Sequence, residues 1–444
     1  MTAAVAEDPD MRPGGAASWR SVALIGLTAL IVRLALVLLV PDGEPCDLLG
    51  WEEAAQRVTQ DGIGSAYATL TPGSLYPPAF FYPLWLTGQL YQTCCSPAFV
   101  VGTGTLDVLM RVAPSIADAL VACLVFALAR AMAPVGGTRA LVAGLLYAVC
   151  PAVLVTVAQR GMIGDPYLAA LVVGAVLAVK RGRRSVAAVC VTLAVLTKPQ
   201  AAALLPLVAL LIWRGASMRA VASALASSAV ATVVILLPFV VAGTLPDVVP
   251  AAQAMANLHP YTQNSADNLW TLLPIWRLAG AEPGGFGEIP DSSTLVTGLS
   301  YRDVGLLAFG ALQVLVLVRL GRDTSTRRLT QAAAVLALGF FIVNTRMHVN
   351  YVFLAFPFLC ALAAGSLSGP ASRLVLVAVT MACIVDWQDG LPWVLHRANA
   401  LLYCTSFAVL LGSSLLRQKR ATFVAQAPEH PPSEVRVAPG HRFA

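Results

Sequence analysis

The stretch GRRSVAAVCVTLAVLTKPQAAALLPL, residues 182–207, is apolar except for its basic start and the break TKPQ at Thr197 to Gln200. A single helix from Val186 to Arg214 would put the basic loops at its two ends on opposite sides of a membrane, against the positive-inside rule. Two short helices that meet at Lys198 and Pro199 satisfy that rule. Each half has about a dozen residues, or about 18 Å, which is too short to cross a bilayer. The stretch therefore predicts a membrane cavity that opens to the outer side, with Lys198 at its floor.

The composition of the whole chain is that of a membrane protein. The chain has 444 residues, of which 58% are hydrophobic and 12% charged, and its mean hydropathy is +0.75. Water-soluble domains contain only about 45 to 50% apolar residues. Backbone polar groups must be paired inside a bilayer, so the apolar runs are expected to be helices. The net charge of +6 comes from arginines in short loops, and we expect membrane lipids rather than nucleic acid as partners.

The basic loops order the apolar runs into an all-α, multi-pass protein of the cell membrane, with about twelve transmembrane helices and both termini in the cytoplasm. We expect a cytoplasmic N-terminal tail at 1–19, a membrane domain at 20–417 and a disordered cytoplasmic tail at 418–444. Two outer loops are predicted at about 41–105 and 243–302. Within the first, Ala79 to Tyr91 is short and aromatic, which is typical of a juxtamembrane helix in the interface.

Acidic residues, scarce elsewhere, gather in the first outer loop between Pro41 and Gly88. They are Glu44, Asp47, Glu52, Glu53 and Asp61. Carboxylates placed just outside a membrane are candidates for acid-base chemistry, although a solvated helix face would explain Glu52 and Glu53 equally well.

The same loop holds three of the nine cysteines, Cys46, Cys94 and Cys95. A disulfide from Cys46 and free thiols both remain open. The spacing of cysteine and histidine does not indicate a metal site.

Several cations lie near the expected outer surface, where an ionised side chain at membrane depth needs a partner. For Lys198 and Arg346 we favour a lipid phosphate, because both side chains donate to phosphate oxygens. His348 lies two residues after Arg346 and could act as a base, a phosphate donor or a neutral structural residue; we favour phosphate contact. Arg33 is late enough in its span to extend toward the outer surface.

Two acids fall within apolar runs, where a charge is costly and often functional. Asp118 could instead be a packing partner for a buried arginine or hydroxyl. Asp165, in GMIGDP, could cap a helix that has Pro166 at its first position.

Taken together, five features resemble the GT-C superfamily of glycosyltransferases, and more narrowly its bacterial members related to protein O-mannosyltransferases and to the glucosyltransferases of lipid-linked oligosaccharide assembly. They cover the chain from Arg33 to Phe358. The features are Asp47 with YPPAFFYPLWLTG at 76–88, the acid that starts the fourth span, the block at 182–207, NLWTLLP at 268–274, and TRMHVNYVFLAFPFL at 345–359.

This resemblance implies inverting transfer of mannose or another hexose from a polyprenyl-phosphate donor to an envelope glycan, lipid or protein, on the extracytoplasmic face. Asp47 matches the acid that serves as base in those families, with Glu44 or Glu52 as alternatives. Lys198, Arg346 and His348 would stabilise the donor phosphate, and no cofactor is expected. The residues expected to bind substrate are Tyr76, Asp165, Gln200, Asn268, Trp270 and Tyr351.

Three positions depart from the family pattern. Leu75 replaces an acid that many relatives have, which leaves a divalent metal open but unsupported. Met162 stands in GMIGD, which lacks the usual glutamine, and Asn350 stands where relatives have arginine. The alternatives are a transporter or flippase of a lipid-linked or small solute, with Asp118, Asp165 and Lys198 along its pathway, and an inactive envelope scaffold.

Overall fold

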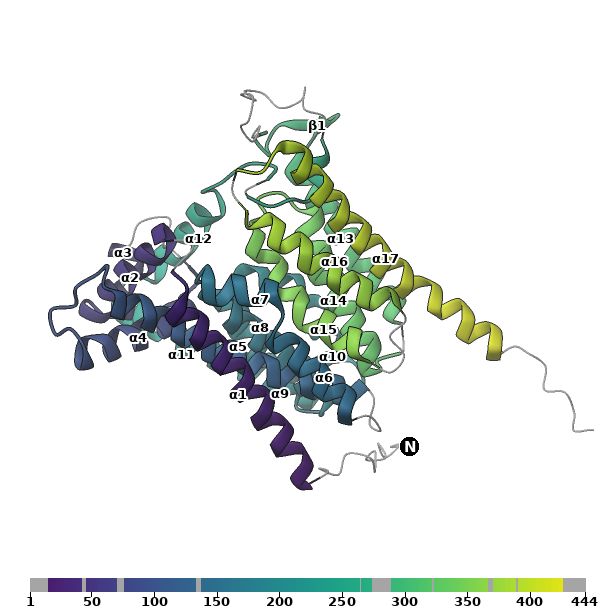
Figure 1. The fold of residues 1–444 in the computed structure, drawn as a ribbon, viewed down its shortest axis with the longest axis horizontal. Helices are drawn as coiled ribbons and strands as arrows, with labels where there is room; N and C mark the ends of the chain where they lie inside the picture. Colours follow the sequence, from purple (N-terminus) through teal and green to yellow (C-terminus); the bar gives the residue numbers. More distant parts are fainter. Residues whose placement is uncertain are drawn as a thin grey trace, which may run out of the picture.

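The computed structural model describes residues 15–41, 45–69, 76–132, 137–263, 265–273, 289–321, 323–365, 370–388 and 390–425. The described residues form a helical bundle (Figure 1), with one small antiparallel sheet, β1 (Thr294–Val296) and β2 (Leu299–Ser300). This architecture confirms the all-α fold class.

Six of the described helices are long and apolar enough to cross a membrane, or seven if the bent pair Gly137–Ala148 and Pro151–Gln159 is one span. The chain is therefore a multi-pass membrane protein. The expected total of about twelve spans remains a prediction, because several of the expected spans correspond to shorter apolar helices.

The helices of the N-terminal half include short 3₁₀ and π segments, labelled η. In chain order they are α1 (Gly15–Leu39), α2 (Pro45–Gln60), η2 (Ile63–Ser65), α3 (Ala66–Thr69), η4 (Pro78–Phe80), α4 (Phe81–Cys94), α5 (Gly104–Met132), α6 (Gly137–Ala148), α7 (Pro151–Leu154), η5 (Val155–Gln159), α8 (Gly164–Lys180), α9 (Arg184–Thr197), η6 (Pro199–Ala203), α10 (Leu205–Trp213) and α11 (Met218–Val241).

The C-terminal half begins with the segment that the sequence predicts to be the second outer loop, here called the second outer segment, and ends in the long helix that extends away from the bundle in Figure 1. Its helices are η7 (Leu245–Asp247), α12 (Val248–Ala256), η8 (Leu269–Leu272), α13 (Tyr301–Leu320), α14 (Thr326–Val343), η10 (Val349–Ala355), α15 (Phe356–Ala364), α16 (Pro370–Asp386) and α17 (Trp393–Ala425). Since α17 continues to Ala425, the first part of the tail that was expected to be disordered is helical.

The break in the 182–207 stretch is confirmed. Lys198 has an extended backbone (φ −146°, ψ 134°) between α9 and η6, as expected for a residue before proline. The guanidinium of Arg184, at the start of α9, donates to the carbonyl oxygen of Arg214 just after α10, at 3.2 Å. The two helices therefore leave from and return to the same side, and Lys198 lies at the turning point.

Arg33 does not extend toward the outer surface, so that expectation was wrong. Its side chain on α1 is fully buried and its Nε donates to Asp118 Oδ2 on α5 at 2.6 Å, while the Tyr147 hydroxyl donates to Asp118 Oδ1 at 2.6 Å. This pairing confirms the packing interpretation of Asp118, because a buried charge is stabilised by an opposite charge and by hydrogen bonds.

The segment predicted to be the first outer loop, here called the first outer segment, is compact. Helices α2 and α4 approach so closely that a Cβ on Gly88 would lie 2.0 Å from Thr59 Oγ1. Glu52 is buried (1% exposed) and accepts from the backbone N–H of Gly102 at 2.8 Å, so the solvated-face interpretation was wrong for Glu52, whereas Glu53 is exposed.

The three cysteines of the first outer segment are exposed free thiols. This holds for Cys46, Cys94 and Cys95 alike, and it favours the free-thiol alternative over a disulfide.

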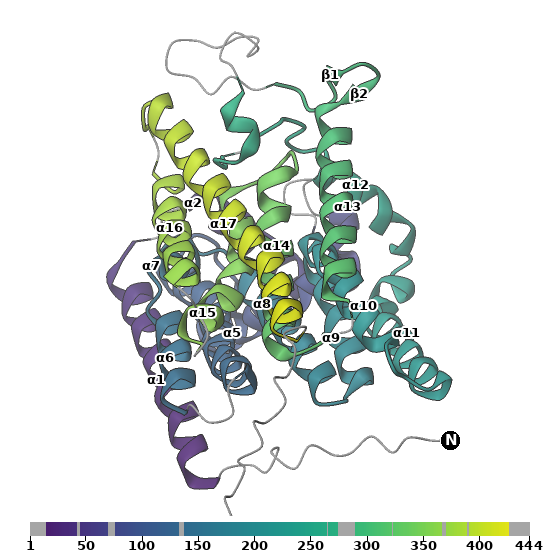
Figure 2. The ribbon, with the colours of Figure 1, turned by 90° about the vertical axis from the view of Figure 1, so that its right-hand side faces the viewer.

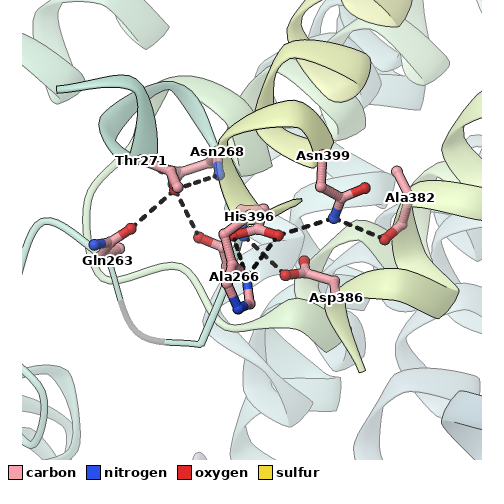
Figure 3. A network of polar contacts seen from close by, with 9 residues as sticks. Gln263, Ala266, Asn268, Thr271, Ala382, Asp386, His396 and Asn399 are labelled. Atoms are coloured by element: carbon pink, nitrogen blue, oxygen red, sulfur yellow. Dashed lines mark hydrogen bonds and ion pairs between the residues drawn. The ribbon is translucent and has the colours of Figure 1, made fainter. Parts of the chain in front are cut away.

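The second outer segment is attached to the C-terminal helices by a buried polar cluster (Figure 3). The Asp267 backbone N–H donates to Asp386 Oδ1 at 3.0 Å, and the Asp267 carboxylate lies 3.1 Å from His396 Nδ1 and accepts from Asn399 Nδ2 at 2.9 Å. The cluster thereby joins the loop before η8 to the end of α16 and the start of α17. In Figure 2 this end of the molecule carries β1 and β2, and α1 begins at the opposite end.

Candidate active site

A buried ion pair lies where α8 begins and α9 breaks. Lys198 Nζ is 2.9 Å from both carboxylate oxygens of Asp165, and the two side chains are 4% and 3% exposed. A Cβ on Gly164 would lie 2.9 Å from Lys198 Cδ, so only glycine leaves room for the lysine stem. The oxygens of Asp165 are therefore engaged by Lys198 and by the Asn350 amide, and Asp165 does not cap α8. The helix-cap interpretation of Asp165 was wrong.

Asn350 extends the ion pair toward the turn before η10. Its Nδ2 donates to Asp165 Oδ2 at 2.9 Å, and its Oδ1 lies 2.8 Å from His348 Nδ1. Burial lowers the pKa of His348, while the Asn350 contact and the charge of Asp47 act in the opposite direction. Lys198, Asp165, Asn350 and His348 thus form one continuous polar chain.

Aromatic side chains surround this chain. Tyr76 stacks on Phe80 with ring centroids 4.1 Å apart, and Trp51 hydrogen-bonds the Tyr76 side chain. Tyr351 lies beneath Lys198, with Nζ 5.8 Å from the ring centroid, and it interacts with the buried side chain of Gln200. Water is thereby restricted near the ion pair, which strengthens its electrostatic interactions.

Asp47 is the exposed acid beside this cluster. It lies in the first turn of α2, where a helix favours negative charge. Burial raises the pKa of Tyr76, and the charges of Tyr351 and Asp47 raise it further; Asp47 also acts on His348. The carboxylate of Asp47 therefore lies within electrostatic range of both side chains. The alternative base Glu44 and the departure at Leu75 fall outside the described residues.

The structure thus brings together most of the predicted site. The residues that it gathers are Asp47, Tyr76, Asp165, Lys198, Gln200, His348 and Tyr351.

Arg346 is directed to a different partner. It has a positive φ of 63° and holds Asp291 with two hydrogen bonds, Nε to Oδ2 at 2.6 Å and Nη2 to Oδ1 at 2.9 Å. Its Nη1 donates to Asn257 Oδ1 at 2.8 Å. Arg346 thus joins the second outer segment to the turn that carries His348, and its predicted phosphate contact would require this pair to open.

Asn268 and Trp270 also lie apart from the cluster. The Asn268 side chain accepts from the Trp270 backbone N–H and donates to the Asn344 carbonyl oxygen at 3.1 Å. The Trp270 indole donates to the Val343 carbonyl oxygen at 3.1 Å. Both side chains are therefore engaged in attaching the outer segment to the end of α14, and their role in substrate binding remains a prediction.

Two residues of the cluster were not expected from the sequence. The sequence marks Asn350 only as a departure from the pattern of the family that the chain resembles, and its two contacts were not predicted. Trp387, just after α16, lies with its ring 5.9 Å from His348 and its Nε1 donating to Thr156 Oγ1 at 3.2 Å. Its only sequence signal was its place directly after Asp386, at the end of an apolar run.

Asp118 belongs to a separate site, because its partners are Arg33 and Tyr147. Within the described parts of the chain, no group of three or more His, Cys, Asp or Glu side chains could hold a metal ion.

The bundle, the broken helix and the short helices between α1 and α5 together form a multi-pass membrane protein. Among solved structures, the chain resembles the crystal structure of ArnT from Cupriavidus metallidurans bound to undecaprenyl phosphate, with a TM-score of 0.50 and 17% identity over 93% of this chain and 80% of that one. This likeness confirms the fold that the sequence resemblance implied.

Two further structures are similar at lower scores. ArnT from the same organism in the apo state has a TM-score of 0.43 and 17% identity over 92% of this chain and 80% of that one. The apo oligosaccharyltransferase of Archaeoglobus fulgidus has a TM-score of 0.42 and 12% identity over 88% of this chain and 56% of that one. No family model and no curated protein matches the sequence.

Proposed function

We propose that this protein is an inverting glycosyltransferase that moves mannose or another hexose from a polyprenyl-phosphate donor to an envelope glycan, lipid or protein, on the extracytoplasmic face of the membrane. The observation that carries the proposal is that an exposed carboxylate, Asp47, and a buried lysine, Lys198, both lie within electrostatic range of His348 in a chain with the GT-C fold. The ArnT structure bound to undecaprenyl phosphate supports a lipid-phosphate donor.

Lys198 is suited to the donor phosphate. An ammonium group has three N–H donors, and two of them serve the oxygens of Asp165. The third is available for a phosphate oxygen, on which negative charge grows as the bond to the sugar breaks. A charge that develops next to a fixed cation in a site with little water is strongly stabilised.

Asp47 is suited to the acceptor. As a hydroxyl oxygen attacks the anomeric carbon, the bond from that carbon to the phosphate oxygen breaks and the hydroxyl proton passes to the carboxylate. The products are the new glycoside and polyprenyl phosphate. Attack from the side opposite the leaving group inverts the anomeric configuration.

The test is transfer from radiolabelled polyprenyl-phosphate sugars in membranes that contain the protein. Asp47→Asn is expected to lower turnover by about 10²-fold or more, the usual contribution of a general base. The control is Glu53→Gln, which neutralises an exposed acid on the same helix and should retain turnover.

Undiminished turnover by Asp47→Asn would remove the assigned base. Movement of the labelled substrate across sealed vesicles, without a new glycosidic bond, would identify a transporter instead.

A further inference from the structure

We propose that His348 is held as the neutral Nδ1–H tautomer and binds a substrate hydroxyl group by accepting its hydrogen bond at Nε2. The inference rests on the proposed function, and it assigns His348 to a sugar or acceptor hydroxyl instead of the donor phosphate.

The tautomer follows from the orientation of the Asn350 amide. A carboxylate paired with lysine only accepts hydrogen bonds, so the group that Asn350 directs at Asp165 Oδ2 must be its NH₂. The carbonyl oxygen Oδ1 then faces His348 Nδ1 at 2.8 Å. Since that oxygen can only accept, Nδ1 must carry the proton, and the hydrogen bond made by one ring nitrogen sets the state of the other.

The second ring nitrogen, Nε2, is then an acceptor. It makes no hydrogen bond to any residue in the part of the chain that the structure describes, and the His348 side chain is only partly buried. Nε2 is therefore available to a ligand. A neutral ring with Nδ1–H directed at Asn350 has no N–H left for a phosphate oxygen, whereas it matches a hydroxyl group, which can donate.

Burial of the ring favours its neutral form over the opposing effect of the nearby carboxylates. Lys198 opposes protonation, while Asp47 on α2 and Asp165 on α8 favour it, and burial outweighs them, so the pKa of His348 is lowered. From η10, Tyr351 contributes a ring whose centroid lies 6.3 Å away. At neutral pH the imidazole is consequently uncharged.

Trp387 is a positioning residue for the same ring. The two rings meet edge to face at 68°, with centroids 5.9 Å apart. The indole is itself fixed, because its Nε1 donates to Thr156 Oγ1 and the Arg160 guanidinium lies 5.1 Å from its ring centroid. Asn350 and Trp387 together therefore restrict the rotation of His348 and keep the direction of Nε2 constant.

Nitrogen NMR of the purified full-length protein, labelled with [¹⁵N]histidine, tests the tautomer without any turnover. The chain has five histidines, and loss of one signal pair in His348→Gln assigns His348. The expected spectrum shows a protonated Nδ1 and an unprotonated Nε2 at neutral pH. In Asn350→Leu, which has no carbonyl acceptor, the proton should shift toward Nε2. A wild-type ring with Nε2 protonated would overturn the proposal.

Transfer kinetics test the hydroxyl contact. His348→Leu should lower kcat/KM by about tenfold or more, as expected when a hydrogen bond to substrate is lost. His348→Gln, which keeps an acceptor oxygen, should retain more activity. It should also lack the loss of activity expected of the wild type when pH falls through the pKa of His348, which burial lowers from the usual 6.5. His259→Gln, at an exposed histidine, is the matched control.

Deoxy substrates identify the source of the hydroxyl. If the bound hydroxyl belongs to the donor sugar, wild type and His348→Leu should have equal kcat/KM with a deoxy donor. If it belongs to the acceptor, they should have equal kcat/KM with a deoxy acceptor. Unchanged kcat/KM in His348→Leu would overturn the contact. If the predicted tautomer is found and the wild type consumes no polyprenyl-phosphate sugar, the proposed function fails and the hydroxyl contact falls with it, while the tautomer assignment stands.

Discussion

Replacing Lys198 with methionine tests how much the buried ion pair contributes to the fold. The methionine keeps most of the apolar stem but leaves the Asp165 carboxylate, 3% exposed, with its hydrogen bond from Asn350 and no cation. Breaking a buried pair by removing one partner costs about 3–5 kcal/mol, because the remaining charge has lost both water and its counter-ion. Lys198→Met should therefore lower the free energy of unfolding by an amount in that range.

The assay is unfolding of the purified protein in mixed micelles by a denaturing detergent. The double variant Lys198→Met/Asp165→Leu should recover most of the lost stability, since replacing both partners with apolar groups is often neutral. Arg219→Met is the matched control, because it removes an exposed cation and should change stability little.

Two results would refute this reasoning. One is a Lys198→Met protein that is as stable as the wild type, and the other is a double variant that is less stable than either single one. Transfer activity separates stability from reaction: if the double variant recovers stability but not transfer, the Lys198–Asp165 pair is needed for the reaction itself.

Three further changes have defined outcomes. Gly164→Ala should lower transfer activity and should lower the free energy of unfolding by about 1–3 kcal/mol, because the added Cβ would lie 2.9 Å from the Lys198 stem. Arg33→Met should cost about 3–5 kcal/mol in the unfolding assay, because it leaves Asp118 as a buried charge, and full stability would contradict this. Burial raises the pKa of Asp267 above its usual 3.8, so the protonated side chain stabilises the folded state. This contribution is complete below pH 3.8 and is lost as pH rises through the raised pKa. Asp267→Asn should make the unfolding free energy fall less steeply with rising pH, and an unchanged slope would exclude Asp267 as its source.

The broken helix could be predicted from the sequence because its causes are local. Pro199 lacks an N–H and disfavours helical geometry at Lys198, and the basic residues at both ends place those ends on one side of the membrane. Both signals lie within about thirty residues, so neither depends on how the rest of the chain folds. Local signals likewise predict a helix after Tyr76, where α4 lies, and its place at the membrane interface stays a prediction.

Contacts between distant residues could not be predicted in this way. Arg33 was expected to extend outward because its position in the run was known, whereas its partner, Asp118, lies 85 residues away. Asn350 was treated as a missing arginine, since the carboxylate that it binds lies 185 residues earlier. In both cases the residue type was informative, but the pairing depends on which helices pack together.

The arrangement of charges constrains how a lipid-phosphate sugar would enter the proposed site. The Lys198–Asp165 pair is neutral as a whole, so Asp47 leaves the cluster with a net negative charge when His348 is neutral. A donor phosphate would therefore be repelled near Asp47 and attracted only toward the third N–H of Lys198. In the proposed reaction, these two preferences would place the phosphate on the lysine side and the anomeric carbon between it and the carboxylate. That order, with base and leaving group on opposite sides of the reacting carbon, is the one that inverting transfer requires.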